Sequence, residues 1–418
     1  MCWVEKEANR NTYYQRRLGD SLKRFLLISD IHACDVDPTS SGAPSYVSTF
    51  PRVGNDIDPF SELERLIEEE KLSIDFILCP GDITNKASKA PFSYAWEKLN
   101  ALANKINAGL ISTVGNHDVD SRYTNNTYDP SEFIKSLTPK LPTNDVGSFR
   151  AFWSENFCLV TSADCNILAL NTAAYHGGGK DAEAEMEYGR ISPPTLIAIK
   201  KALRDAPLRG TNILLCHHHL LKSDISDVSA AGVTRGGDVL VDLLNDRPEA
   251  WIVVHGHRHI PELIYGHGGS NSPTIVGSAS FSAQINFDAQ NKNPNQVHLL
   301  TSDPTAAIRS GWVSTGEIRS WTWQPGIGWK KARGPHGLNH VTGFGFRSSV
   351  MFLANQIDQY LKGQGKEHVS WNEASLAHPP LSWLIPSDFR ALEAALAKFR
   401  IAILVDRDGS YAQIGRSS

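Results

Sequence analysis

The sequence predicts an α/β fold that is followed by a C-terminal α+β extension. Short apolar segments alternate with amphipathic helical patterns through the first two thirds of the chain, and β-type segments follow residue 270. Strands that alternate with helices are typical of layered α/β architectures. The length of 418 residues is enough for one large domain and an extension.

The predicted elements of the first half alternate regularly. The expected strands are 24–29, 74–79 and 109–114. The expected helices are 60–71 and 92–107. The first helix carries Leu63, Leu66 and Ile67 at helical spacing, so these side chains share one buried face.

The second half continues the alternation and then changes in character. Further strands are expected at 166–170, 212–216 and 251–254, with a helix at 193–204. Two helices are expected near the end, at 347–362 and 387–399. Long polar loops at 35–59 and 120–148 are expected to carry substrate specificity, because loops of this length inside a compact domain are usually functional.

Composition limits the classes of protein to which this chain can belong. Lys and Arg number 41 against 45 Asp and Glu, so a net charge of −4 argues against nucleic acid as the main partner and leaves a small phosphorylated substrate open. No apolar run approaches the ~20 residues of a membrane span. Six cysteines without paired spacing favour reduced thiols. We expect a cytoplasmic protein without membrane contact, and its oligomeric state is left open.

Polar side chains of metal-ligand type follow five of the predicted strands. They are Asp30 and His32, Asp82, Asn116 with His117 and Asp118, His217, and His257 with His259. Because the carboxyl ends of strands in an open α/β sheet converge on one crevice, we expect these side chains to meet. Oxygen and imidazole donors suit Mn, Fe, Zn or Co. Without His117 and Asp118, for which other roles are expected, seven ligands remain; they exceed the needs of one ion and suit two ions about 3.5–4 Å apart.

In order, the blocks D-x-H, GD, GNHD, H and GHxH resemble the calcineurin-like metallophosphoesterase superfamily over residues 24–280. The resemblance implies a four-layer α/β/β/α sandwich of two packed sheets between helices. We therefore expect an N-terminal arm over 1–23 and a metallophosphoesterase-like catalytic domain over 24–332. The remaining segment, 335–418, is expected to be an extension of unknown role.

The resemblance also implies roles for the residues at the strand ends. One ion would be bound by Asp30, His32, Asp82 and His259. The other would be bound by Asp82, Asn116, His217 and His257, so that Asp82 bridges the two. His117 would face the substrate phosphate, and Asp118 is expected to orient its imidazole. The implied reaction is hydrolysis of a phosphate mono- or diester by a hydroxide that bridges the ions.

Some positions leave alternatives open. The fourth block commonly reads H-x-P, and here three histidines stand in a row; His217 is preferred because it directly follows the strand, with His218 as the alternative. Purple acid phosphatases of the superfamily carry Tyr where Asn85 stands, so a phenolate ligand is not expected. His219 and His255 fall out of register with the ligands, and burial or hydrogen bonding is at least as expected for them as ligation.

Two other functions remain as alternatives. Some proteins with a similar core cut DNA, although the acidic balance and the lack of a basic stripe disfavour a metal-dependent nuclease here. A non-catalytic scaffold with a retained metal site is the other alternative. Such a scaffold would be expected to have lost ligands, whereas every block is intact in this sequence.

Overall fold

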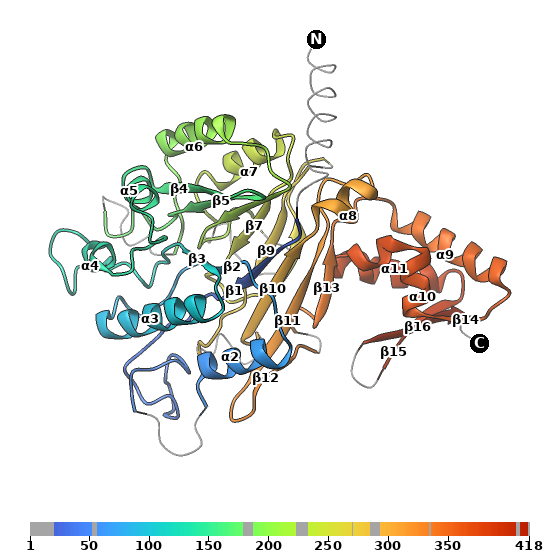
Figure 1. The fold of residues 1–418 in the computed structure, drawn as a ribbon, viewed down its shortest axis with the longest axis horizontal. Coiled ribbons are helices and arrows are strands. Elements are labelled where there is room, and N and C mark those ends of the chain that lie inside the picture. Colours follow the sequence, from blue (N-terminus) through green and yellow to red (C-terminus); the bar gives the residue numbers. More distant parts are fainter. Residues whose placement is uncertain are drawn as a thin grey trace, which may run out of the picture.

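The body of the protein is a sandwich of two β-sheets with helices on both outer faces, as the sequence predicts (Figure 1). The computed structural model describes residues 21–51, 57–178, 187–222, 233–269, 271–284, 293–333, 336–406 and 410–416. The expected N-terminal arm lies outside these residues except for 21–23.

The first sheet has seven strands in the order β12-β11-β10-β1-β2-β3, with β13 paired to β11. Its parallel part consists of β1 (Lys23–Leu27), β2 (Phe76–Cys79) and β3 (Gly109–Ser112). The connecting helices are α2 (Pro59–Glu69) and α3 (Lys89–Lys105). The antiparallel part consists of β10 (Gln296–Ser302), β11 (Gly316–Gln324), β12 (Gly328–Lys331) and β13 (Val341–Phe344), with α8 (Pro304–Arg309) after β10.

The second sheet has six strands in the order β4-β5-β6-β7-β9-β8. Its parallel centre is β5 (Cys165–Leu170), β6 (Thr211–Leu215), β7 (Ile252–His255) and β9 (Thr274–Gly277). Antiparallel strands β4 (Phe157–Thr161) and β8 (Glu262–Tyr265) form the edges. The helices on this half are α5 (Val146–Glu155), α6 (Pro193–Asp205) and α7 (Gly237–Asn245). The short helix α4 (Glu132–Ser136) packs against α3, with the rings of Phe133 and Phe92 6.0 Å apart.

Burial of both faces explains why the central strands of the second sheet read as continuous apolar runs. Successive side chains of a strand point to opposite faces. In β6, Ile213 and Leu215 join the core between the sheets, whereas Leu214 packs with residues of α6 and α7. Figure 1 accordingly shows α6 and α7 on one side of the sandwich and α2 and α3 on the other.

The C-terminal part forms a small module with its own core and its own sheet, β14-β16-β15. Its elements are α9 (Val350–Gln364), β14 (His368–Ser370), α10 (Trp371–Ala377), the 3-10 helix η3 (Pro379–Trp383), α11 (Pro386–Ala397), β15 (Ile401–Val405) and β16 (Tyr411–Arg416). Both helices expected near the chain end are therefore confirmed as α9 and α11.

The module is joined to the second sheet through β8. The guanidinium of Arg347 lies 3.3 Å from the ring centroid of Tyr265 and donates to the hydroxyl and carbonyl oxygens of Ser272, both at 2.8 Å. The amide of Gly345 donates to the Tyr265 hydroxyl at 2.9 Å. These contacts fix the entry to α9 against the edge of the sandwich.

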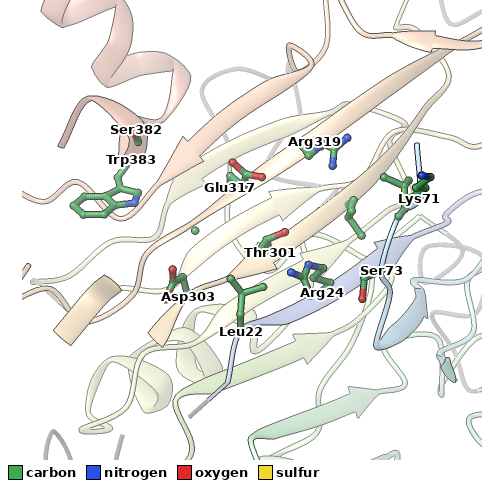
Figure 2. Close-up of a pocket in the computed structure, with 13 residues that line it drawn as sticks. Leu22, Arg24, Lys71, Ser73, Thr301, Asp303, Glu317, Arg319, Ser382 and Trp383 are labelled. Carbon is green, nitrogen blue, oxygen red and sulfur yellow. The ribbon is translucent and has the colours of Figure 1, made fainter. Parts of the chain in front are cut away.

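A groove of about 480 Å³ lies on the first sheet beside η3, lined by Ser382 and Trp383 of η3. Figure 2 shows Arg24, Thr301 and Glu317 on its floor, and these residues stand opposite one another on β1, β10 and β11. Arg24 is the second residue of β1, whereas Asp30 follows the end of that strand. The groove therefore opens at the edge opposite the residues of metal-ligand type.

Two further expectations can be compared with the described residues. No helix among them is long and apolar enough to cross a membrane. Five cysteines lie within this part of the chain, and all five are free and buried, as expected for reduced thiols: Cys34, Cys79, Cys158, Cys165 and Cys216.

Candidate metal centre

The polar side chains that follow the strands come together where the carboxyl ends of both sheets meet. Asp30 and His32 follow β1, Asp82 follows β2, Asn116 and His117 follow β3, His217 follows β6, and His257 and His259 follow β7. Asp30, His32, Asp82, His217 and His259 are buried, whereas Asn116, His117 and His257 are partly exposed. The exposed members leave the cluster accessible from outside.

The first group of donors surrounds His32 and His259. Their Nε2 atoms lie 3.0 Å apart. Oδ1 of Asp30 lies 3.4 Å from Nε2 of His259, and Oδ2 of Asp82 lies 3.6 Å from Nε2 of His32. Two carboxylates and two imidazoles thus direct their donor atoms at one small volume.

The second group surrounds His217. Its Nε2 lies 3.3 Å from Oδ2 of Asp82 and 3.0 Å from Oδ1 of Asn116. The same Asn116 oxygen lies 3.0 Å from Nδ1 of His257. Because Asp82 contacts His217 here and His32 in the first group, its carboxylate joins the two groups.

The backbone at these residues is unusual. Asp30, His32, Asp82, His257 and His259 all have φ between 50° and 77°, the left-handed region. For residues other than glycine this costs about 1–2 kcal/mol each. Such strain persists where the surrounding structure enforces it, and it clusters at functional sites.

Hydrogen bonds and two glycines hold the strained turns in place. The amide of His257 donates to both carboxylate oxygens of Asp30, at 3.0 and 3.2 Å. A Cβ on Gly115 would lie 2.1 Å from Oδ1 of Asp82, and one on Gly256 would lie 2.3 Å from Oδ2 of Asp30. Glycine is therefore required at both positions for the carboxylates to reach the cluster.

The pKa shifts in the cluster indicate that its buried carboxylates are stabilised by positive charge. Burial by itself would raise the pKa of Asp30, but His259 and His217 lower it to about 2. Burial by itself would lower the pKa of His217, but Asp82 and Asp30 raise it to about 9. Burial lowers the pKa of His32 to about 3, so that this imidazole stays neutral. Two ionised carboxylates, those of Asp30 and Asp82, thus lie buried beside a protonated His217 and a neutral His32.

These residues fit divalent metal ions. Four overlapping sets have donor atoms close enough to share an ion, namely Asp30 with His32 and His259, Asp30 with Asp82 and His217, His32 with Asp82 and His117, and His217 with His218 and His257. Nδ1 of His32 is buried without a hydrogen-bond partner in the described part of the chain. A cation would satisfy the carboxylates in place of a proton on His217.

His117 lies at the open side of the cluster. Its amide donates to Oδ1 of Asp82 at 2.8 Å, and its ring lies 4.6 Å from that of His32, centroid to centroid. Nδ1 of His117 lies 3.2 Å from Oδ1 of Asn85. Beside the imidazole is a cavity of about 310 Å³, also lined by Lys86 and Arg122.

The contact expected between Asp118 and the imidazole of His117 differs from the one observed. Asp118 accepts from the amides of Gly115 at 2.9 Å and Thr84 at 3.0 Å, so it fixes the turn that carries Asn116 and His117. Asn85 makes the contact to the ring in its place. Burial, with Asp82 nearby, raises the pKa of Asp118 to about 7. The sequence pattern draws attention to Asn85 only because purple acid phosphatases carry a tyrosine at this position, and it does not predict the contact with His117.

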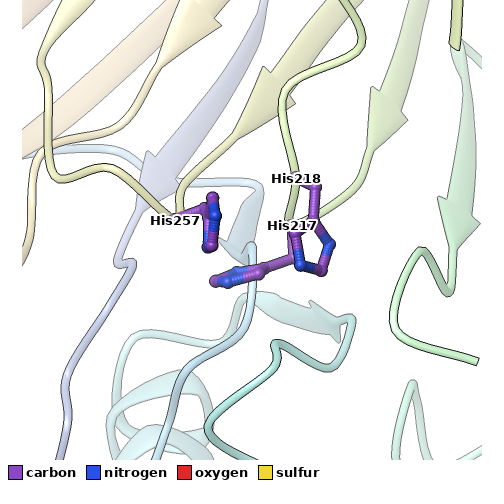
Figure 3. A group of neighbouring side chains, drawn as sticks. All are labelled: His217, His218 and His257. Carbon is purple, nitrogen blue, oxygen red and sulfur yellow. The ribbon is translucent and has the colours of Figure 1, made fainter. Parts of the chain in front are cut away.

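The histidines beside the predicted ligands are all buried. His218 lies next to His217 and His257, as Figure 3 shows, and its Nδ1 is 2.7 Å from the hydroxyl of Thr172. His217 contacts Asp82 and Asn116, which sets it apart from His218. His219 and His255 lie together elsewhere, against Glu262, which sequence reasoning did not single out.

Comparison with known proteins agrees with this arrangement. Residues 23–261 match the calcineurin-like phosphoesterase family, and residues 342–398 match the family wHTH-Calcineurin_assc. No curated protein sequence matches the chain.

The solved structures that match the chain include two phosphatases. For the purple acid phosphatase PPD1 from yellow lupin (Lupinus luteus) the TM-score is 0.48 at 14% identity, with 73% of this chain and 52% of the lupin chain covered. The chain thus spans about half the length of the lupin enzyme. For a dimetal phosphatase from Danio rerio the TM-score is 0.47 at 11% identity, with 74% and 98% covered. Because the family match spans more than half of the sequence, the chain belongs to the calcineurin-like phosphoesterase family, and it carries a C-terminal winged helix-turn-helix domain.

Proposed function

We propose that the enzyme hydrolyses a phosphate mono- or diester of a small molecule at a centre of two divalent ions. The observation that carries the proposal is the position of Asp82. Its Oδ2 lies 3.6 Å from Nε2 of His32 and 3.3 Å from Nε2 of His217, so one carboxylate serves two groups of ligands. Two ions bridged by a carboxylate are a recurrent arrangement for in-line displacement at phosphorus.

The distances support the following division of ligands. One ion is held by Asp30, His32, Asp82 and His259, and the other by Asp82, Asn116, His217 and His257. His217 is favoured over His218 because its Nε2 approaches both Asp82 and Asn116. Mn, Fe, Zn and Co are all compatible with these donors. When bound, the ions supply positive charge for the phosphate oxygens and lower the pKa of water.

His117 is proposed to give a proton to the departing oxygen. Asn85 engages its Nδ1, which leaves Nε2 to face the substrate. A positioned imidazole contributes to the rate by transferring a proton as the bond to the leaving group breaks. Lys86 and Arg122 line the adjacent cavity and would attract an anionic ester.

A nuclease is the second candidate function. The observation that favours it is the C-terminal winged helix-turn-helix domain, because helix-turn-helix modules of several proteins dock into DNA. The acidic balance of the chain opposes it. The scaffold alternative is opposed by the complete set of donors around Asp82.

A substrate panel tests the proposal. The full chain, reconstituted with Mn, Fe, Zn or Co, is assayed on phosphomonoesters, cyclic nucleotides, glycerophosphodiesters, and single- and double-stranded DNA. Turnover of a small ester that disappears on chelation and returns with metal is expected. Cleavage of DNA alone would replace the proposal with the nuclease. Inactivity on every substrate despite bound metal would favour the scaffold.

A further inference from the structure

A second cluster of ligand-type side chains lies apart from the candidate metal centre. Oε1 of Glu262 is 3.8 Å from Nδ1 of His219 and 3.7 Å from Nε2 of His255. The two imidazole rings lie 4.1 Å apart, centroid to centroid. All three side chains are buried, with at most 2% of each exposed.

The register of the second sheet brings two of these side chains together. His255 of β7 stands opposite Gly277 of β9, and Gly277 stands opposite Glu262 of β8. The three form one row across the sheet, so His255 and Glu262 project from the same face on either side of a glycine. A Cβ on Gly277 would lie 2.6 Å from Cγ of Glu262 and 3.3 Å from Cε1 of His255. Glycine thus leaves the space in which the two side chains meet.

This face of the sheet is the one covered by helices. Val253 and Ile275 precede His255 and Gly277 by two residues, and both pack in the core beneath α6 and α7. Val254 and Val276, one residue further on, point into the core between the two sheets. Because side chains alternate along a strand, the His219–His255–Glu262 cluster lies on the helix-covered face, away from the space between the sheets.

The distances in the cluster are those of ligands around an ion. Separations of 3.7 and 3.8 Å are too long for hydrogen bonds between the imidazoles and the carboxylate. Ligands at about 2.0–2.1 Å from a tetrahedral ion lie roughly 3.4 Å from one another. Neither ring nitrogen of His219 has a hydrogen-bond partner among the residues that the structure describes. A buried imidazole in this state costs free energy unless something else engages it.

We propose that His219, His255 and Glu262 bind one additional divalent ion of the zinc type. Two imidazoles and one carboxylate are a frequent set of protein ligands for zinc. The ion joins the loop after β6 to β7 and β8. His219 lies two residues after His217, and His255 two residues before His257. The additional ion therefore braces the two segments that present ligands to the candidate metal centre, without itself contacting substrate.

Metal content after substitution of Glu262 tests the site. The full chain and its Glu262→Gln variant are dialysed against Zn²⁺, and bound zinc is measured by elemental analysis. The variant should lose one equivalent, both in the wild-type background and in an Asp82→Ala background, so the result is independent of how many ions Asp82 holds. Glu249→Gln, which alters a buried carboxylate paired with Arg247, is the matched control and should lose none. Equal zinc content in Glu262→Gln and wild type would overturn the site.

A second substitution, Gly277→Ala, tests the geometry without removing a ligand; its added Cβ would also lie 2.8 Å from the carbonyl oxygen of Ile260, so the unfolding temperature is measured alongside. Gly277→Ala should displace Glu262 and weaken zinc binding at this site by about tenfold or more, as loss of supporting contacts around metal ligands commonly does. Gly363→Ala in α9, where an added Cβ meets nothing within 4 Å, is the control. Zinc affinity unchanged by Gly277→Ala would contradict the proposed contact.

A measurement on the unmutated protein avoids any effect of substitution on folding. Crystals of the wild-type chain grown with zinc should show an anomalous peak at the zinc edge between the three side chains. Zinc at the Asp82 centre without a peak at Glu262 would overturn this inference while leaving the proposed function intact. A peak at Glu262 without one at Asp82 would contradict the proposed two-ion centre while supporting this inference.

Discussion

Nδ1 of His117 lies 3.2 Å from Oδ1 of Asn85, and this contact fixes the plane of the imidazole that faces the substrate cavity. Asn85 stands three residues after Asp82, on the same loop. The proposed proton donor and the proposed bridging ligand are therefore positioned by one short segment of chain, since Asp82 also accepts from the amide of His117 at 2.8 Å.

Asn85→Ala should leave metal content unchanged and lower the rate by about tenfold, because it frees the His117 ring without removing a ligand. The loss should be larger for esters with poor leaving groups, whose departure needs the proton most. Rates on alkyl and nitrophenyl phosphates, each measured over a pH series, check this. A uniform loss on both ester types would mean that Asn85 serves folding alone.

His117→Ala should keep its metal and lose about 10²–10⁴-fold in rate on alkyl phosphates, with a clearly smaller loss on nitrophenyl phosphates. A nitrophenolate departs without help, whereas a basic alkoxide requires protonation. Elemental analysis accompanies the kinetics, because the donor atoms of His117 lie close to those of His32 and Asp82. Metal lost from the variant would make His117 a ligand.

Asp82→Ala should lose metal from both groups of ligands, since its carboxylate approaches His32 and His217 alike. Removal of the shared negative charge leaves two cations facing each other without screening. Elemental analysis after dialysis against Mn²⁺ checks this, with the partly exposed Asp37→Ala as the control. Manganese content equal to that of the wild type would remove Asp82 from the ligand set.

His217→Ala should lose about one equivalent of manganese, whereas His218→Ala should retain the full content. His217 contacts Asp82 and Asn116, and His218 contacts the hydroxyl of Thr172. Because His218 is buried, its substitution should still lower the unfolding temperature. Loss of metal from His218→Ala but not from His217→Ala would make His218 the ligand in place of His217.

His298→Gln should make stability less sensitive to acid. Burial lowers the pKa of His298 to about 3, against about 6.5 in an unfolded chain. Between pH 6.5 and about pH 3 the imidazole is protonated in the unfolded state but not in the folded state. The free energy of unfolding therefore falls by about 1.4 kcal/mol for each unit by which the pH falls. Urea unfolding at pH 7 and pH 5 should show a smaller acid loss in the variant. His336→Gln, at an exposed position, should behave as wild type.

The alternating elements of the sandwich could be predicted because each apolar run coincides with one buried strand or one buried helix face. The predicted strand 74–79 became β2 (Phe76–Cys79), and the predicted helix 193–204 became α6. In α6 the local signals agree, since the Ser192 side chain caps the helix and proline follows at its first position. By contrast, α7 begins after Gly236 at φ 82°, where the sequence carries no capping side chain.

The ligand positions could be predicted because parallel strands bring their carboxyl ends together. Side-chain contacts that depend on the register between strands could not be predicted. Glu262 meets His255 across Gly277, and nothing local to β8 signals which residue of β9 stands opposite. Asn85 reaches His117 through a backbone that turns at Lys86 and Ala87, both with positive φ. Tertiary pairing, and not local preference, sets these contacts.

The pairing of β13 with β11 has a consequence for how the protein could be divided. Residues 316–319 of β11 have β10 along one side and β13 along the other. A fragment that ends before Val341 would leave the amides and carbonyls along that side of β11 unpaired. Exposed strand edges recruit other strands, so such a fragment would be expected to self-associate. The match to the winged helix-turn-helix family begins at residue 342, inside a strand that the phosphoesterase sheet needs, so a soluble catalytic fragment would have to extend through Phe344.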